Sequence, residues 1–188
     1  LIYIFIITTE VLGQIYHFYT RVPIFDIIIH TYSSFVISYI ALIIIKKHKL
    51  PKIITILFIF SFAMMCESIW EIFEFGTDHL LKTDMQKDTI ITSVSSVAMN
   101  PSGENKPVIL DNIGKTLIYD TDGNLLYTVN DGYLDIGLND TIEDLFVNFI
   151  GAIVFSCFAF FDLKHNRSNS FINRFVPTKG NNKLIKSI

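Results

Sequence analysis

The strongest constraint on this chain is an apolar run that ends in acidic residues at helical spacing. The run covers about residues 52–75 and carries Glu67, Glu71 and Glu74 in its last turns, with Asp78 just beyond them. Their spacing places these carboxylates on one stripe of a helix. An ionised carboxylate is costly in hydrocarbon, so such residues face a protein interior, a water-filled cavity or a partner. The rest of the fold has to supply that polar environment.

The composition places the chain among membrane proteins. Hydrophobic side chains make up 51% of the 188 residues, and they are gathered in blocks rather than spread evenly. The two cysteines, Cys66 and Cys157, both fall inside apolar runs. Small, weakly polar side chains in such runs usually pack, so the sequence predicts neither a disulfide nor a cysteine metal site.

We expect an all-α polytopic membrane protein: a bundle of at least four transmembrane helices with a small extracytoplasmic β-hairpin insertion. A bilayer core of roughly 30 Å needs about 20 residues at a rise of about 1.5 Å per residue. The expected spans are residues 1–19, 24–45, 52–75 and 139–161. The expected organisation is three helices in 1–77, an acidic loop in 78–138, a fourth helix in 139–161 and a basic tail in 162–188.

The first of these spans has an alternative reading as a secretory signal. It lacks a basic start and a small-residue cleavage site, and it carries Glu10 in the middle of the run, so we favour a membrane helix. The chain starts at Leu1 and is apolar from that residue. We therefore expect that an N-terminal portion precedes it.

Lysine and arginine predict the orientation. Four basic residues lie in the loop 46–52 and six in the tail 162–188, which is ten of the 15 in the chain. By the positive-inside rule, both segments are cytoplasmic. The segment from Asp78 to Asp135 has nine acidic residues against four lysines and is expected outside. We expect a multi-pass protein of the cytoplasmic membrane, with the lipid bilayer as its first partner.

The outer segment contains a hairpin signal. Lys115–Asp120 and Leu125–Val129 are strand-like runs, and Thr121–Asn124 between them is rich in turn residues. Val108–Leu110 is a candidate for a third strand. The Asp-x-Asp-Gly-Asn series of the turn is similar to part of a calcium loop, but it lacks the full ligand spacing and the distal Glu, which favours turn chemistry.

Polar residues of all four expected spans converge on the outer half of the bilayer. The spans contribute, in order, Glu10, Gln14 and His17; Asp26, His30, Ser33, Ser34 and Ser38; Glu67, Glu71 and Glu74; and Asp140, Asp144 and Asn148, with Gly151 allowing a close helix approach. Several carboxylates with one or two imidazoles suit a divalent cation, and helical bundles hold metals in this way. The candidate metal ligands are Glu71, Glu74, Asp140 and Asp144.

The same residues give the other site candidates. Catalytic candidates are Glu67, Glu71, Glu74 and His30, and ligand-binding candidates are Asp26, His30, Arg21 and Asn148, with Arg21 placed to engage a lipid phosphate. Some of the polar residues also have simpler structural interpretations. Asp78, Asp140 and Glu143 also suit helix caps or interface positions, and His17 suits an interface anchor.

The leading function hypothesis is a site that binds a divalent cation and recognises or processes a lipid-linked ligand. The alternatives are a transporter or proton-coupled permease component, with Glu10, His17 and Glu67 among the relay groups, and a non-catalytic accessory protein that docks a membrane protein partner. The sequence contains no Gly-rich phosphate loop and no HExxH. We expect no nucleic-acid partner, and whether the protein is an enzyme stays open.

Four motifs carry a resemblance to known families. They are Asp26-x-x-x-His30, Glu67-x-x-Trp70-Glu71-Ile-Phe-Glu74-Phe, Met85-Gln86-Lys87-Asp88-Thr89, and Asp140-Thr-Ile-Glu-Asp144-Leu-x-x-Asn148-x-x-Gly151-Ala152. Over about Glu10 to Phe161 the chain resembles the uncharacterised bacterial membrane-spanning family that includes the inner-membrane protein YjdF. It is more distantly similar to the VanZ-like family, which tends to show Glu-x-x-Gln where this chain has Glu71–Phe75. The resemblance implies a small helical bundle, often with extra N-terminal helices, and it implies no reaction.

Overall fold

The computed structural model describes residues 2–22, 24–48 and 50–165. The chain divides into two compact units, and the boundaries fall inside two long helices. One unit contains the chain up to Ile69 and again from Asp144 onward, and the other is Trp70–Glu143. Each unit is described by itself. The predicted basic tail lies outside the described residues from residue 166 onward.

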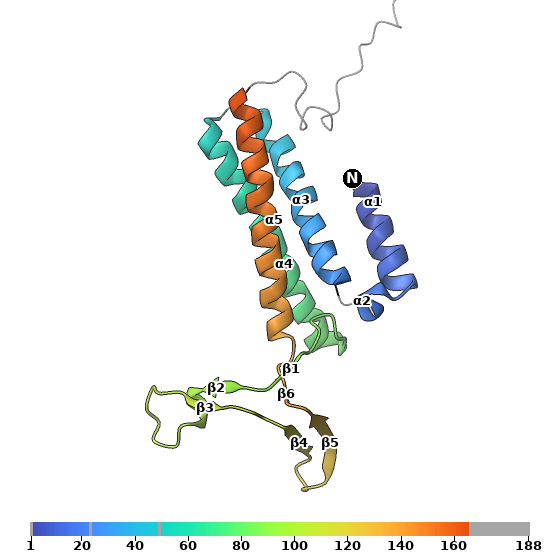
Figure 1. Cartoon of the computed structure of the whole chain (residues 1–188). Coiled ribbons are helices and arrows are strands. Elements are labelled where there is room, and N and C mark those ends of the chain that lie inside the picture. Colours follow the sequence, from blue (N-terminus) through green and yellow to red (C-terminus); the bar gives the residue numbers. More distant parts are fainter. Residues whose placement is uncertain (1, 23, 49, 166–188) are drawn as a thin grey trace, which may run out of the picture. The chain divides into compact units, whose positions relative to one another are not determined.

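Three long helices dominate the structure: α3 (Phe25–Lys46), α4 (Lys52–Leu81) and α5 (Leu138–His165). Each is long and apolar enough to cross a membrane. They confirm three of the four expected helices, although α4 runs on to Leu81 where we expected an end near residue 75. In the first unit, α3, α5 and the beginning of α4 lie side by side (Figure 1).

The fourth expected span, residues 1–19, is not confirmed. The chain instead forms α1 (Ile2–Ile7), a π-helix η1 (Thr8–Ile15) and a short α2 (Phe18–Arg21), and the apolar helix over Ile2–Ile15 is shorter than a full span. The Tyr16 N–H donates to the Val11 carbonyl at 3.0 Å, which is the wide π spacing. His17 then adopts a left-handed conformation with φ of 57°, which ends the helix.

The core of the first unit is an apolar cluster shared by the three long helices. Its buried members are Ala41, Leu42 and Ile45 of α3, Ile59 of α4, and Phe155 and Ala159 of α5. Lipid tails are as apolar as these side chains, so helix association in a membrane depends on close packing and small residues. The alanines let the backbones approach, and Phe35 meets Phe155 edge-on with ring centroids 6.0 Å apart.

The second unit contains three antiparallel strand pairs. β1 (Ile90–Ile91) pairs with β6 (Tyr133–Leu134), β2 (Val94–Ser96) with β3 (Val108–Leu110), and β4 (Lys115–Tyr119) with β5 (Leu125–Asn130), and a 3-10 turn, η2 (Val97–Met99), follows β2. The expected hairpin is confirmed as β4–β5. Val108–Leu110 is a strand as expected, but it joins β2 rather than the hairpin.

The hairpin turn is organised by one aspartate. The Asp120 carboxylate accepts hydrogen bonds from the backbone N–H groups of Asp122 and Asn124, at 3.0 and 2.7 Å, and from the Asn124 side-chain amide at 2.9 Å. The Asn124 bonds hold the pKa of Asp120 below its ordinary value. This is the turn chemistry that the sequence favoured over a calcium loop, because the carboxylate oxygens accept hydrogen bonds from the local backbone.

Gly151 allows a first test of how closely α3 and α5 pack. An added Cβ at Gly151 would lie 3.0 Å from the Ser34 Cβ and 3.1 Å from its Oγ, whereas nothing lies within 4 Å of one at Gly76 on α4. Alanine is favoured over glycine in a helix by about 0.5–1 kcal/mol. We expect Gly76→Ala to raise the thermal midpoint and Gly151→Ala to lower it or leave it unchanged. Equal gains in both variants would contradict this close packing.

Candidate functional site

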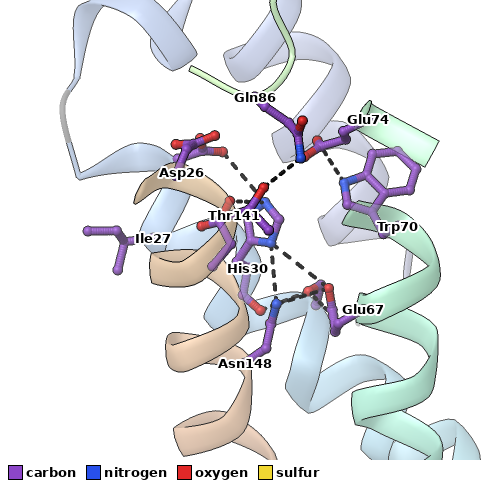
Figure 2. A network of polar contacts seen from close by, with 12 residues as sticks. Asp26, Ile27, His30, Glu67, Trp70, Glu74, Gln86, Thr141 and Asn148 are labelled. Carbon is purple, nitrogen blue, oxygen red and sulfur yellow. Dashed lines mark hydrogen bonds and ion pairs between the residues drawn. The ribbon is translucent and has the colours of Figure 1, made fainter. Parts of the chain in front are cut away.

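His30 is the centre of a polar cluster in the first unit. Its Nε2 lies 3.3 Å from Asp144 Oδ2 and 3.8 Å from Asp26 Oδ1, and its Nδ1 lies 3.9 Å from Glu67 Oε2. His30, Glu67 and Asp144 are almost fully buried, with 6%, 2% and 3% of their surfaces exposed. Figure 2 shows His30 between Asp26 on one side and Glu67 on the other. One imidazole therefore meets carboxylates from α3, α4 and α5.

Helical spacing explains why these side chains meet. Asp26 and His30 are one turn apart on α3, and Asp144 and Asn148 are one turn apart on α5, so each pair projects from one face of its helix. Asp26 and His30 lie near the start of α3, and Asp144 and Asn148 lie at the start of the part of α5 that belongs to this unit. α4 brings Glu67 to them. The sequence predicted all five residues as site candidates, and the structure brings them together.

Hydrogen bonds fix the Glu67 carboxylate. Ser33 Oγ donates to Glu67 Oε1 at 2.5 Å, and Asn148 Nδ2 donates to Glu67 Oε2 at 3.1 Å. Asn148 Nδ2 also lies 3.4 Å from His30 Nδ1. Ser34 Oγ donates to the Asn148 backbone carbonyl at 2.9 Å, which ties α3 to α5 at this level. Glu67 is thus oriented from two helices besides its own.

The cluster has more acidic groups than basic ones. On α3, α4 and α5 every lysine lies at or next to a helix end, namely Lys46, Lys52 and Lys164, and these helices carry no arginine. Three carboxylates share one imidazole in an apolar bundle. Buried charges are costly unless they are paired, so protons or a metal ion at this site would offset the excess of carboxylates over the imidazole.

The geometry of three groups suits a cation. His30 Nε2 faces both aspartates, and the carboxylates of Asp26 and Asp144 offer oxygens within 4.8 Å of each other. Ligands bound at about 2.0–2.2 Å from one ion lie roughly 3–4 Å apart, so small side-chain adjustments bring these atoms to one ion. One imidazole with carboxylates suits Zn, Mn or Fe better than Ca.

The structure distributes the predicted metal ligands between the two units. Asp144 belongs to the first unit, while Glu71, Glu74 and Asp140 belong to the second. In that unit Glu74 Oε1 accepts from Trp70 Nε1 at 2.9 Å, and Asp140 Oδ2 accepts from the Lys87 backbone N–H at 2.9 Å. Glu71 is buried, with 4% of its surface exposed. A metal site that joins these four residues stays a prediction.

The candidates near the N-terminus lie apart from the cluster. Glu10, Gln14, His17 and Arg21 are all exposed. Among the described residues, no hydrogen bond or ion pair joins Glu10 or His17 to His30. The wide π turn of η1 and the left-handed His17 change the face on which these side chains project, so their straight-helix spacing does not apply.

In the second unit, acidic side chains hold the segment after α4 by its backbone. The Asp78 carboxylate accepts from the backbone N–H groups of Met85 and Gln86, at 2.7 and 2.8 Å, and from Thr83 Oγ at 2.7 Å. Gln86 Nε2 donates to Thr141 Oγ at 2.5 Å (Figure 2). Asp78 thus has a structural role. Asp140 has a similar role, because it accepts a hydrogen bond from the Lys87 backbone N–H in the same segment.

Asp135 is a residue whose role the sequence did not reveal. Its buried carboxylate accepts from Thr89 N–H at 2.8 Å, Thr89 Oγ at 3.0 Å, Asn139 N–H at 2.9 Å and Gly137 N–H at 3.3 Å. It therefore caps the first turn of α5, a position for which the sequence offered Asp140. Burial opposes the charged form, but the hydrogen bonds from Thr89, Asn139 and Gly137 outweigh it and lower the pKa of Asp135.

The only signal for this cap was an aspartate two residues before a glycine near the helix start. Gly137 has φ of +83°, and an added Cβ would lie 2.7 Å from the Gln86 Cβ. Glycine is the residue that accepts this conformation at close approach. Pairing of Asp135 with Thr89, 46 positions earlier, is a long-range contact that local patterns do not encode.

Comparison with known families decides the class of protein. The family described as "Predicted membrane protein (DUF2238)" matches residues 1–165, which include every residue of the His30 cluster. The chain belongs to this family. No curated protein and no solved structure matches the DUF2238 chain. Its likeness to the family that includes YjdF and to the VanZ-like family stays a prediction.

The Asp135 cap generates a pH prediction. Because the folded-state pKa lies below the ordinary value of 3.8, the cap stabilises the fold above about pH 4, and this contribution is lost as the pH falls through the folded pKa. We expect hydrogen exchange at the Thr89 and Asn139 amides to accelerate there, and Asp135→Asn to show fast exchange already at neutral pH. Exposed Asp84→Asn is the control. Unchanged exchange in Asp135→Asn would rule out the cap.

Proposed function

We propose that this DUF2238 protein binds a divalent cation between Asp26, His30 and Asp144 and uses it to recognise or process a lipid-linked ligand. In this proposal the protein is a multi-pass protein of the cytoplasmic membrane, and the site lies in the outer half of the bilayer. The observation that carries it is the buried excess of carboxylates around one imidazole. A divalent ion would offset this excess in one step.

The residues have distinct roles in the proposed site. His30 Nε2 and the two aspartates are the ligands. His30 Nδ1 faces Glu67, and a carboxylate on the second ring nitrogen is the usual way in which proteins orient a metal-binding histidine. Ser33 and Asn148 hold Glu67 in turn. Catalysis by Glu67 or His30, and ligand binding by Asn148, remain parts of the proposal.

The ligand class follows from the charge of the bound ion. A divalent cation polarises phosphoryl or carbonyl oxygens and attracts anionic groups. At the depth of a bilayer, the molecules that present such groups to a protein are amphiphiles with an anionic head. Exposed Arg21 at the end of α2 offers a planar donor that suits phosphate.

Metal analysis tests the proposal. We expect near-stoichiometric divalent metal in the detergent-purified wild type and at least a tenfold loss of affinity in Asp144→Asn and His30→Ala, since each removes a ligand. Glu143→Gln is the matched control, because it removes the same charge at the exposed neighbouring position. Circular dichroism confirms that each variant folds. A wild type that holds no metal after supplementation, or equal metal in all variants, would reject the site.

One observation favours a second candidate, a proton-coupled function. Ser33, Glu67, Asn148 and His30 follow one another through contacts of 2.5, 3.1 and 3.4 Å, and His30 leads on to Asp144. Chains of acids and histidines inside spans mark proton pathways. In this candidate, protons instead of a metal neutralise the carboxylates, and the site works without metal. The metal analysis therefore separates the two candidates.

A further inference from the structure

An isoleucine in the second unit has a strained backbone conformation. Ile136 lies in the turn between β6 and the start of α5 (Figure 1), and its φ of 53° falls in the left-handed region. A bulky or β-branched residue in this region is an outlier, because its side chain crowds its own backbone. Such strain costs free energy and persists only where the surrounding structure enforces it.

The residues on both sides of Ile136 enforce the strain. The Asp135 carboxylate accepts hydrogen bonds from the backbone N–H groups of Thr89, Gly137 and Asn139. Gly137 itself has φ of +83° and lies close against Gln86. Neither end of the turn can therefore rotate to relax the isoleucine. Glycine or asparagine would adopt the same conformation at lower cost, so the backbone does not explain why this residue is an isoleucine.

Packing within the second unit does not explain the isoleucine either. Of the Ile136 surface 76% is exposed, and Leu138 and Tyr133 next to the turn are 64% and 43% exposed. A side chain that is three-quarters exposed gains little stability from burial in its own unit. The apolar surface of these three side chains is thus open to a partner outside the unit.

The length of α5 identifies the surroundings of this turn. The apolar part of the helix, Leu138–Leu163, has 26 residues and can cross a membrane. At a rise of about 1.5 Å per residue it measures about 39 Å, which exceeds the hydrocarbon core of roughly 30 Å but fits a bilayer with its headgroups, about 40–45 Å. In a membrane-spanning α5, the first turn and the residues just before it therefore lie at the level of the headgroups.

The chemistry of the turn suits a lipid surface. Leu138 and Ile142 are one turn apart on α5 and both are exposed, so the exposed apolar face of the span continues to the first residue of the helix. Tyrosine is enriched at membrane interfaces, where its ring is in contact with lipid and its hydroxyl with water. The nearby acids Asp135 and Asp140 accept hydrogen bonds from the backbone N–H groups of residues 87 and 89, which compensates part of their charge.

We propose that Ile136, Leu138 and Tyr133 are an interfacial anchor, which inserts into the lipid surface where α5 enters the membrane. The strained turn presents Ile136 to the lipid, and the hydrogen bonds of Asp135 keep it in place. Asp144 follows Leu138 by six residues, about 9 Å along the helix, so the anchor fixes the depth of this carboxylate in the bilayer. The inference goes beyond the proposed function and does not rest on it, because no residue of the anchor is a proposed metal ligand.

Spin labelling of the full chain in phosphatidylcholine vesicles tests the anchor. The label is attached to Ile136→Cys in a background in which both native cysteines, Cys66 and Cys157, are replaced by alanine. Collisions with oxygen, which concentrates in lipid, are compared with collisions with a water-soluble nickel chelate. A label on Asp122→Cys, in the exposed hairpin turn, is the aqueous control.

We expect the ratio of oxygen to nickel collisions to be several-fold higher at residue 136 than at residue 122. A ratio equal to that at residue 122 would place the side chain in water and overturn the proposal. Few collisions with either reagent would show a protein partner over the turn and would overturn it as well. Leu138→Cys gives the same test with the strained residue intact, and circular dichroism confirms that each variant folds. Metal content plays no part in this readout, so its outcome is separate from that of the metal analysis.

Discussion

The structure of the first unit depends on the balance of charge around His30. Three helices that are long and apolar enough to cross a membrane each bring a carboxylate to one buried imidazole, and their lysines stay at the helix ends. An unpaired charge in such an environment is destabilising, so the helices have to keep His30 and its acids in register. Close packing and hydrogen bonds elsewhere in the unit keep the helices in this register. Gly151 and the alanines of the apolar cluster allow the close approach, and Ser33, Ser34 and Asn148 fix the side chains.

Carboxylates have two different uses in this chain. In the first unit they meet the His30 ring and the side chains of Ser33 and Asn148. In the second unit Asp78, Asp120 and Asp135 accept several backbone N–H groups each and hold turns and a helix start. A carboxylate saturated by backbone donors is a structural element. The number of acidic residues on a helix stripe thus says little about function until their partners are known.

Much of the site was predictable from the sequence, because the relevant pattern is local. Spacing of four residues pairs Asp26 with His30 and Asp144 with Asn148, and the depth of each along its apolar run aligns them with Glu67. The hairpin was also predictable, from strand propensity on both sides of a turn sequence. The first span is not confirmed, because a π-helix and a left-handed His17 leave no signature in the length of an apolar run. Asp135 was missed because its partner Thr89 is far away in the sequence. The structural roles of Asp78 and Asp140 were not predictable either, because their partners are backbone N–H groups whose positions depend on the conformation of residues 83–89.

The contact on which the site depends is that of the His30 ring with the Asp144 carboxylate of another helix. Carbon–nitrogen dipolar recoupling by solid-state NMR, on protein in lipid bilayers, measures this contact directly between the His30 ring nitrogens and the Asp144 carboxyl carbon. The His30 signals are assigned by their loss in His30→Gln. We expect strong dephasing of the Asp144 carboxyl by the His30 Nε2, as a nitrogen–oxygen distance of 3.3 Å requires. Absence of dephasing in a folded, bilayer-embedded sample would rule out this contact.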